Sequence, residues 1–492
     1  MSHWQPIPDR TAARVLGRAL RDAGYSEAGL TNLLGDEAYE YDRDEGPVAE
    51  RRLPDTRLGV VIRAFFLQLP IAVREASRAI GRAAVEALEA TALAEVGDNV
   101  VPRVRIVPVG ELLVASDDFP DENGVERADY VAAYTPTSRI CDSLTPRRRV
   151  ERALDVGCGS GVQALLAARH AERVIATDVN PRALAYTELN AALNGFTNIE
   201  CRRGSLFEPV ADEHFDLITS NSPYVVSPEN RLVYRDAGFR GDELSEQIVR
   251  GAAEHLTDHG FASLLVSWIA DDEDAPDERP LAWVEPFDGD AWILPVWGSD
   301  PIAHAATWNE TLAGDDEAFR SALDEWMDYL ADVGARWVTE GAVLLHRRPG
   351  SGYTIRIDEI DDETLEDAGA QVERAFDARA RLSGVNRSAA LLDAPLLLAT
   401  RLTLARELGP QDGRAVTGAG RVELSAGTRS SVDTTAQALE VLAALDGRTA
   451  LADVIQATAG RLRLADAEST RLRREALRLS RELLELGALR LD

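Results

Sequence analysis

The stretch that decides the fold is Leu154-Asp155-Val156-Gly157-Cys158-Gly159-Ser160-Gly161, which ends a strand pattern (Val150–Val156) and opens a helix pattern (Gly161–His170). Glycines at alternate positions let the backbone turn tightly and approach a ligand closely. The order Asp-x-Gly-x-Gly-x-Gly differs from the Gly-x-Gly-x-x-Gly spacing of a dinucleotide fingerprint. We therefore predict a strand, a glycine turn and a helix that together bind a nucleoside cofactor.

Strand and helix patterns alternate downstream of this turn. Such alternation is typical of a parallel sheet flanked by helices and predicts an α/β fold. The expected strands are 173–178, 198–204, 215–220 and 261–269, with a closing strand pair in 336–346; the expected helices are 181–194, 242–256 and 318–331.

Two further motifs lie at predicted strand ends. Asp178 closes the second strand, where a carboxylate can accept both hydroxyls of a ribose. Asn221-Ser222-Pro223-Tyr224 follows the strand Phe215–Ser220, and its Asn-x-Pro-Tyr pattern indicates a planar amino group held for alkylation. Upstream of the glycine turn lies Thr135-Pro136-Thr137. The combination gives a reaction class that none of these motifs gives alone.

Together the motifs resemble the class I S-adenosylmethionine-dependent methyltransferases. Within them they resemble the Asn-Pro-Pro-Tyr group, which includes release-factor glutamine methyltransferases and N6-adenine and N2-guanine methyltransferases. The resemblance covers about 128–270 well and extends loosely to 350. It implies a Rossmann-like core with a mainly parallel seven-stranded sheet and S-adenosylmethionine as cofactor. The cofactor-binding residues that it implies are Thr135, Asp155, Gly157, Gly159, Gly161, Asp178, Ser205, Leu206 and Asn221.

The resemblance also implies the catalytic residues Asn221, Ser222, Pro223 and Tyr224. In such enzymes an Asn side-chain oxygen and the next backbone carbonyl accept hydrogens of the acceptor nitrogen, and the Tyr stacks on the planar group. Ser222 stands where relatives usually have proline. The carbonyl belongs to the backbone and survives this change, whereas the fixed φ of proline is lost. Methyl transfer of this kind needs no metal.

The acceptor is a planar amide or amine. Glutamine amide, adenine N6 and guanine N2 present the same hydrogen-bonding face, so the motif does not separate them. The net charge of −30 disfavours broad adhesion to nucleic acid. We therefore expect a protein glutamine, on a translation or release factor. Two alternatives stay open: an N6-adenine or N2-guanine methyltransferase acting on RNA or DNA, and a nucleic-acid-binding regulator that senses the cofactor without turnover.

Composition sets wider limits on the chain. Its 492 residues favour two or three domains. The sequence contains no uninterrupted apolar run of about 18 residues, so we expect no membrane span. The three cysteines form neither a disulfide framework nor a zinc pattern, which is typical of a reducing cytoplasm. All 53 basic residues other than histidine are arginine, so no lysine acts as base or phosphate anchor.

The expected domains are a mainly helical N-terminal domain (1–100), a β-hairpin with the methyltransferase domain (101–350), and an α-rich, winged-helix-like C-terminal domain (351–492). The last long helix, Ala467–Leu486, carries five arginines interleaved with glutamates. It is either a nucleic-acid contact or a charged solvent face.

Two further segments allow two interpretations each. The segment Tyr234–Gly238 either borders a substrate entrance or is a solvated loop. Trp292, Trp297 and Trp308 lie in or beside an apparently irregular stretch, Leu294–Trp308, and form either a lid or ordinary core packing.

Overall fold

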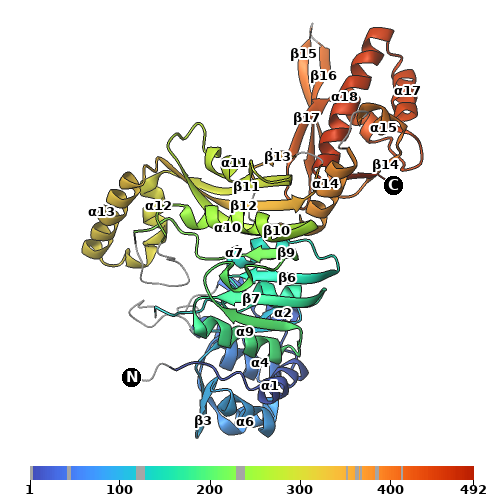
Figure 1. Ribbon diagram of the computed structural model, residues 1–492. Helices are drawn as coiled ribbons and strands as arrows, with labels where there is room; N and C mark the ends of the chain where they lie inside the picture. The colour runs from blue at the N-terminus through green and yellow to red at the C-terminus, as the bar shows by residue number, and fades with distance from the viewer. Residues whose placement is uncertain are drawn as a thin grey trace.

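The computed structural model describes residues 4–40, 46–117, 128–228, 239–350, 353–360, 365, 368–382, 387–411 and 414–491. Figure 1 shows the N-terminal helices at one end of the molecule, the large sheet in the middle and the C-terminal helices at the other end. In the described part of the chain, no helix has both the length and the apolar character needed to cross a bilayer.

The central sheet confirms the predicted Rossmann-like α/β fold. Its strand order is β13-β11-β12-β10-β9-β6-β7-β8, and the five strands from β10 to β8 are parallel, as are β11 and β13. Strand β12 is antiparallel to both of its neighbours. The strands are β6 (Val150–Val156), β7 (Ala171–Asp178), β8 (Ile199–Arg203), β9 (Phe215–Ser220), β10 (Leu256–Ala270), β11 (Gly289–Ser299), β12 (Trp337–Arg347) and β13 (Thr354–Ile357).

Two details of the predicted sheet are wrong. The sheet has eight strands instead of seven, because β13 adds to its edge beside β11. The segment 336–346 is part of one strand, β12, whose partner β11 (Gly289–Ser299) extends into the stretch Leu294–Trp308, which the sequence pattern predicts to be irregular. Strand β11 is buried on both faces over its first six residues, so its apolar residues do not alternate with polar ones.

Helices cover both faces of this sheet. The helix after β7 begins at Pro181, a residue suited to the first helical turn. Asn180 is its N-cap, and the Asn180 side chain accepts the Arg182 N–H. The helices are α7 (Pro136–Leu144), α8 (Val162–Ala167), α9 (Pro181–Leu193), α10 (Glu243–His255), α11 (Glu278–Val284), α12 (Pro301–Trp308) and α13 (Asp316–Asp332).

The N-terminal part packs on helix α9 of the central part. Helix α1 approaches α9 so closely that a Cβ added to Gly17 would lie 2.0 Å from the Leu193 carbonyl oxygen. The alanine-rich periodic pattern of 73–95 predicts one long helix, but the structure has two, α5 and α6, because Gly81 between them has a φ of 85°. The elements are α1 (Arg10–Asp22), α2 (Glu27–Leu34), η1 (Asp36–Glu40), α3 (Gly46–Arg52), α4 (Arg57–Val61), a π-helical turn η3 (Ile62–Phe66), α5 (Val73–Ile80), α6 (Arg82–Ala90), β1 (Ile71–Ala72), β2 (Ala94–Val96), β3 (Asn99–Pro102), and the hairpin β4 (Arg105–Val109) and β5 (Leu112–Ser116).

The C-terminal part contains more strand than predicted. The apolar pattern of 391–408 predicts helices, but the structure has one short helix followed by two strands. Leu402 and Leu404 alternate with polar or small residues and pair with β16. The apolar end of the sequence, 488–491, predicts a terminal strand, which is confirmed and pairs with β14. The elements are α14 (Ala368–Leu382), α15 (Arg387–Asp393), β14 (Leu396–Leu398), β15 (Leu402–Gln411), β16 (Arg414–Leu424), β17 (Ser431–Thr435), α16 (Ala436–Leu442), α17 (Leu451–Leu462), α18 (Asp466–Glu485) and β18 (Leu489–Leu491).

Of the three tryptophans in the region read as irregular, Trp292 is core. Its side chain is fully buried, and the indole N–H donates to Asp358 Oδ2 at 2.8 Å. Trp308 lies on α12, and its indole N–H donates to the Glu340 carboxylate at 2.9 Å. Trp297 is half-buried on β11. For Trp292 the core-packing interpretation is therefore right.

Candidate functional site

The glycine turn joins β6 to α8 at the carboxyl edge of the parallel strands, where ligands bind in open α/β sheets. Its glycines have φ angles of 68° (Gly157), 53° (Gly159) and 83° (Gly161), which favour glycine at each position. A Cβ on Gly161 would lie 2.8 Å from the Thr187 side chain, whereas one on Gly159 would meet no atom within 4 Å. Gly159 therefore borders open space.

Two acidic residues hold this turn from different sides. Asp155 is buried, and its carboxylate accepts the Ala164 N–H at 2.9 Å and the Thr219 hydroxyl at 3.2 Å. Burial raises the pKa of Asp155 to about 7, although these two hydrogen bonds stabilise the carboxylate and lower the pKa. The Asp155 carboxylate thus joins β6, β9 and the start of α8, so it supports the turn from within the protein.

Asp178 ends β7 beside the turn. Its carboxylate accepts the Gly159 N–H at 3.0 Å and the Asn180 N–H at 2.8 Å. Burial raises its pKa, while these backbone donors oppose the increase. The next side chain, Val179, is apolar yet 47% exposed. A carboxylate and an exposed apolar surface therefore adjoin each other, next to the open side of the glycine turn.

The turn after β8 completes this edge. Leu206 has a φ of 48°, which is rare for a side chain with a Cβ, and its carbonyl accepts the Thr177 hydroxyl at 3.3 Å. The Ser205 N–H donates to Glu208 at 3.2 Å. The carboxylate of Asp178, the apolar Val179 and the close backbone approach at Gly159 fit a nucleoside that carries an amino-acid chain.

Asn221 follows β9, and helix α7 fixes its orientation. Its amide Nδ2 donates weakly to the hydroxyls of Thr137 at 3.5 Å and Ser138 at 3.3 Å. Thr135 caps the same helix turn, with its Oγ1 accepting the Ser138 N–H at 3.1 Å. Because Nδ2 faces α7, the oxygen Oδ1 points away from it. In the described part of the chain no group donates to Asn221 Oδ1 or to the backbone carbonyl of the next residue, Ser222.

Ser222 shows how the chain accommodates a residue other than proline here. The side chain is buried, and its hydroxyl donates to the Val156 carbonyl at 3.0 Å and lies 2.8 Å from Ser220 Oγ. A Cβ on Gly157 would lie 2.3 Å from Ser222 Oγ. The Ser222 hydroxyl therefore ties the loop to the end of β6, which supplies part of the rigidity that a proline ring would give.

The last motif residues continue into the protein. Pro223 is half-buried, and Tyr224 is 8% exposed. Burial raises the pKa of Tyr224 well above its usual range, and the nearby Thr137 side chain partly opposes that increase. The Tyr224 carbonyl accepts a hydrogen bond from the Ser267 hydroxyl. The upstream Thr-Pro-Thr element and the Asn221 motif therefore meet in the structure, although they are more than 80 residues apart in the sequence.

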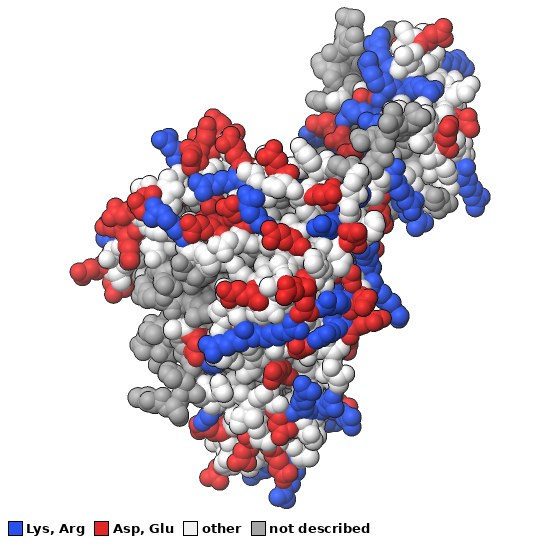
Figure 2. Space-filling model, viewed as in Figure 1, with Lys and Arg blue, Asp and Glu red and all other residues white. Residues whose placement is uncertain are grey.

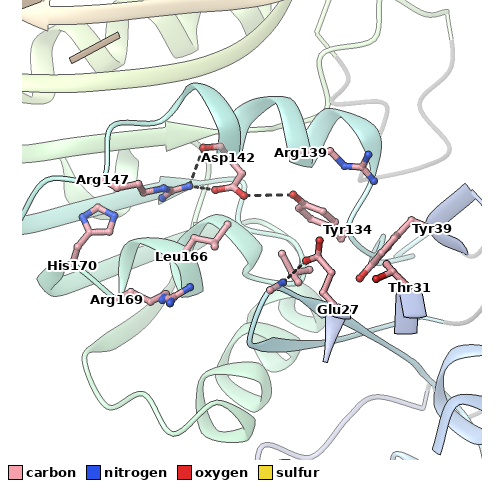
Figure 3. Close-up of a pocket in the computed structure, with 12 residues that line it drawn as sticks. Glu27, Thr31, Tyr39, Tyr134, Arg139, Asp142, Arg147, Leu166, Arg169 and His170 are labelled. Atoms are coloured by element: carbon pink, nitrogen blue, oxygen red, sulfur yellow. Dashed lines mark hydrogen bonds and ion pairs between the residues drawn. The ribbon is translucent and has the colours of Figure 1, made fainter. Parts of the chain in front are cut away.

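Polar contacts fix the outer side of α7 as well. Figure 3 shows Arg147 donating to the Asp142 carboxylate and to its carbonyl, the latter at 3.1 Å, while the Tyr134 hydroxyl donates to Asp142 at 3.5 Å. These residues line a cavity of about 710 Å³ between α2, the β4–β5 turn, α7 and α8. Helix α7 is thus held on one side by the ion pair and bonded to Asn221 on the other.

Several contributors escaped the sequence analysis. Hydroxyl residues within helices and strands usually indicate nothing about function, so their partners emerge only from tertiary contacts. Those that contact the site are Ser138, Thr187, Thr219 and Ser220. The segment Tyr234–Gly238 lies outside the described residues. Among the described residues, no group of three or more His, Cys, Asp or Glu side chains is placed to hold a metal ion.

Comparison with known families matches this region directly. Residues 136–268 match the family model described as Methyltransferase small domain. The chain carries a methyltransferase small domain. The match confirms the resemblance to class I methyltransferases that the glycine turn and the Asn221 motif predicted. Residues 22–105 match a Domain of unknown function (DUF7059).

Curated proteins are also similar to part of this chain. The ribosomal protein uL3 glutamine methyltransferase of Bradyrhizobium diazoefficiens is 33% identical over 168 residues, or 31% of this chain and 52% of that protein. A release factor glutamine methyltransferase of Xylella fastidiosa is 34% identical over 129 residues, or 24% and 47% of the two chains. The chain spans about half the length of the curated relatives it matches.

Two solved structures are similar to part of this chain. The YcgJ protein from Bacillus subtilis has 16% identity and a TM-score of 0.30, covering 44% of this chain and 100% of that chain. A methyltransferase from Pyrococcus furiosus has 18% identity and a TM-score of 0.29, covering 46% and 89%.

Proposed function

We propose that this chain is an S-adenosylmethionine-dependent N-methyltransferase that acts on the side-chain amide of a protein glutamine. The observation that carries the proposal is the pair of hydrogen-bond acceptors at the end of β9. Asn221 Oδ1 and the Ser222 carbonyl are adjacent, receive no donor from the described residues and lie beside the glycine turn. A planar NH₂ group offers two hydrogens to such a pair.

The cofactor would lie along the edge of β6, β7 and β8. Asp178 would accept the ribose hydroxyls, and Val179 and the turn at Ser205 and Leu206 would border the base. Gly157, Gly159 and Gly161 would let the backbone approach the amino-acid chain. Asp155 supports the turn, and Thr135 caps the helix that closes over it. When bound, S-adenosylmethionine supplies an activated methyl group, so the protein mainly has to align the acceptor nitrogen.

The Asn221 motif performs this alignment. Hydrogen bonds from the amide hydrogens to Asn221 Oδ1 and the Ser222 carbonyl draw the nitrogen toward tetrahedral geometry and direct its lone pair at the methyl carbon. These bonds strengthen as positive charge develops on nitrogen, which is the property that lowers a barrier. Pro223 restricts the loop, and the ring of Tyr224 forms a wall of the acceptor site. The proton released from nitrogen passes to solvent.

Three considerations favour glutamine as the acceptor. The named relatives methylate glutamine in ribosomal protein uL3 or in release factors. The net charge of −30 disfavours extended contact with RNA or DNA. The three cysteines are free thiols, as expected of a protein that works in the cytoplasm beside the translation apparatus.

We also propose three domains, 1–100, 101–350 and 351–492, with the outer two serving the central one. The N-terminal domain braces the methyltransferase domain through α1 and α9. The C-terminal domain packs on α7 through α14, where a Cβ on Gly369 would lie 2.4 Å from the Thr145 carbonyl oxygen.

The decisive experiment replaces Asn221. Asn221→Ala removes an acceptor for a nitrogen that becomes charged, and loss of one such donor or acceptor typically costs about 10²–10³-fold in turnover. We expect that loss in methyl transfer to purified release factor or uL3, with affinity for the cofactor within about threefold of wild type. Asn309→Ala, at the buried asparagine that ends α12 and donates to the Ala305 carbonyl, is the matched control. Retained turnover in Asn221→Ala, or label entering only RNA or DNA, would reject the proposal.

A further inference from the structure

Helix α18 borders a groove whose lining is rich in arginine. The groove has a volume of about 590 Å³, and its cationic residues are Arg356, Arg473, Arg474, Arg478 and Arg481. The four on α18 recur at the spacing of one helix face, with Arg356 on β13 across from them. Figure 2 shows basic side chains gathered along α18, whereas the α12–α13 region is mostly acidic. We refer to this feature as the arginine groove.

Internal ion pairs use some of these charges. Arg478 pairs with Glu475 at 2.6 Å and with Glu482 at 2.7 Å, and Arg356 pairs with Asp358. The interleaved glutamates predicted from the sequence therefore neutralise the middle of the helix face.

The other three guanidinium groups of the arginine groove form no ion pair with a described residue. Among the described residues, Arg473 and Arg474 are exposed and make no ion pair or hydrogen bond. Arg481 donates to Ser388 Oγ at 3.2 Å, and its buried Nε has no partner. Like charges on neighbouring turns repel, so this arrangement weakens the isolated helix slightly. An anion in the groove would remove that repulsion and satisfy the free donors.

The spacing and the residue type indicate the anion. Guanidinium is planar, is always charged and matches the oxygens of a phosphate in a two-pronged geometry. From Arg473 to Arg481 the helix rises about 12 Å, at 1.5 Å per residue. That length spans about three or four phosphates of one nucleic-acid strand at roughly 3.4 Å each. We propose that the arginine groove binds the phosphodiester backbone of a nucleic-acid strand.

The charge of the whole protein limits this contact. At −30 the chain repels a polyanion, so binding is confined to the groove, involves few phosphates and weakens steeply with salt. The arginine groove lies between α18 and β13, an edge strand of the central sheet, away from β9, which precedes the Asn221 motif; Figure 1 shows α18 well separated from β9. The inference is therefore independent of the proposed methyl transfer: the groove would hold the enzyme near its nucleic-acid-rich surroundings without reading bases.

The test uses the full chain and a labelled 12-nucleotide strand, as RNA in one arm and DNA in the other, with binding followed by anisotropy between 50 and 200 mM salt. Three contacting arginines predict a slope of log affinity against log salt of about −2 for a single strand. Arg473→Gln/Arg474→Gln should bring the slope to about −0.7 and reduce affinity at 50 mM salt by at least tenfold. Arg448→Gln/Arg490→Gln removes the same charge from exposed C-terminal positions outside the groove and should change neither value.

The two arms identify which nucleic acid fits better. Equal slopes for the two double variants would overturn the proposal, as would absence of binding at 50 mM salt. A polyglutamate peptide of the same charge is the third arm. If it bound more tightly than both strands, the groove would be a site for an acidic protein segment and the proposal would be wrong.

Discussion

The close approach between Gly157 and Ser222 gives a prediction that the structure makes quantitative. In Gly157→Ala the new methyl group would lie 2.3 Å from Ser222 Oγ, 3.1 Å from its Cβ and 3.3 Å from its Cα, at a φ of 68°. A side chain in the left-handed region costs about 1–2 kcal/mol, and overpacking a buried site costs about 1–3 kcal/mol. We expect the free energy of unfolding to fall by about 2–5 kcal/mol.

Gly159→Ala is the matched comparison. Gly159 has a similar φ of 53°, but its added Cβ would meet no atom within 4 Å. The conformational cost of about 1–2 kcal/mol is then the whole effect on stability. Since Gly159 borders open space at the predicted cofactor site, this variant should lose cofactor affinity out of proportion to its loss of stability.

The double variant Gly157→Ala/Ser222→Ala isolates the contact. Removing Ser222 Oγ relieves the 2.3 Å approach, while Ser220 still donates to the Val156 carbonyl at 3.2 Å. Ser222→Ala alone should cost about 1 kcal/mol for one hydrogen bond. The double variant should be more stable than the sum of the single losses predicts, by at least about 1 kcal/mol. Unfolding in denaturant, followed by tryptophan fluorescence, measures the four variants against the wild type. Strict additivity, or equal losses in Gly157→Ala and Gly159→Ala, would refute the reasoning.

Three more predictions concern carboxylates. The pKa of Asp155 in the folded protein, about 7, exceeds its value in the unfolded chain. The contribution of Asp155 to stability is therefore greatest below about pH 4 and falls as the pH rises through 7. Asp155→Asn should flatten that part of the plot of unfolding free energy against pH. Asp178→Ala removes a charged acceptor and should weaken cofactor binding by about 10–100-fold in calorimetry, whereas Asp178→Asn, which keeps one acceptor, should lose less. Asp117 forms a buried ion pair with Arg182, so Asp117→Ala should cost about 3–5 kcal/mol in denaturant unfolding, and a loss below 1 kcal/mol would contradict the pairing.

The sequence by itself determined the α/β core and the placement of its motifs. The parallel strands β6, β7 and β9 are short, apolar and bounded by polar or glycine residues, so their pattern has one interpretation. Asp178 ends one such strand and Asn221 directly follows another. Parallel strands bring their carboxyl ends to one edge of the sheet, so these two residues lie at the same edge. The predicted site could therefore be read from local signals.

The sequence pattern failed where burial was two-sided or where secondary structure depended on a distant partner. Strand β11 lacks alternation because both of its faces are covered over the first six residues. The strand that begins at Leu402 reads equally well as an apolar helix until β16 pairs with it. In both segments the deciding hydrogen bonds come from residues that are not neighbours in the sequence.

The tertiary structure alone decided how the motifs act on one another. Nothing local to Asn221 indicates which way its amide faces; the hydroxyls of α7 decide this from more than 80 residues away. Nothing local to Ser222 explains how the loop is secured without proline, whereas the packed β6 strand supplies a carbonyl acceptor. The same holds for Arg481 of α18, whose guanidinium donates to the Ser388 hydroxyl of α15, 93 residues away. Covalent sequence fixes which groups are present, but hydrogen-bond direction and charge pairing are set by contacts that exist only after folding.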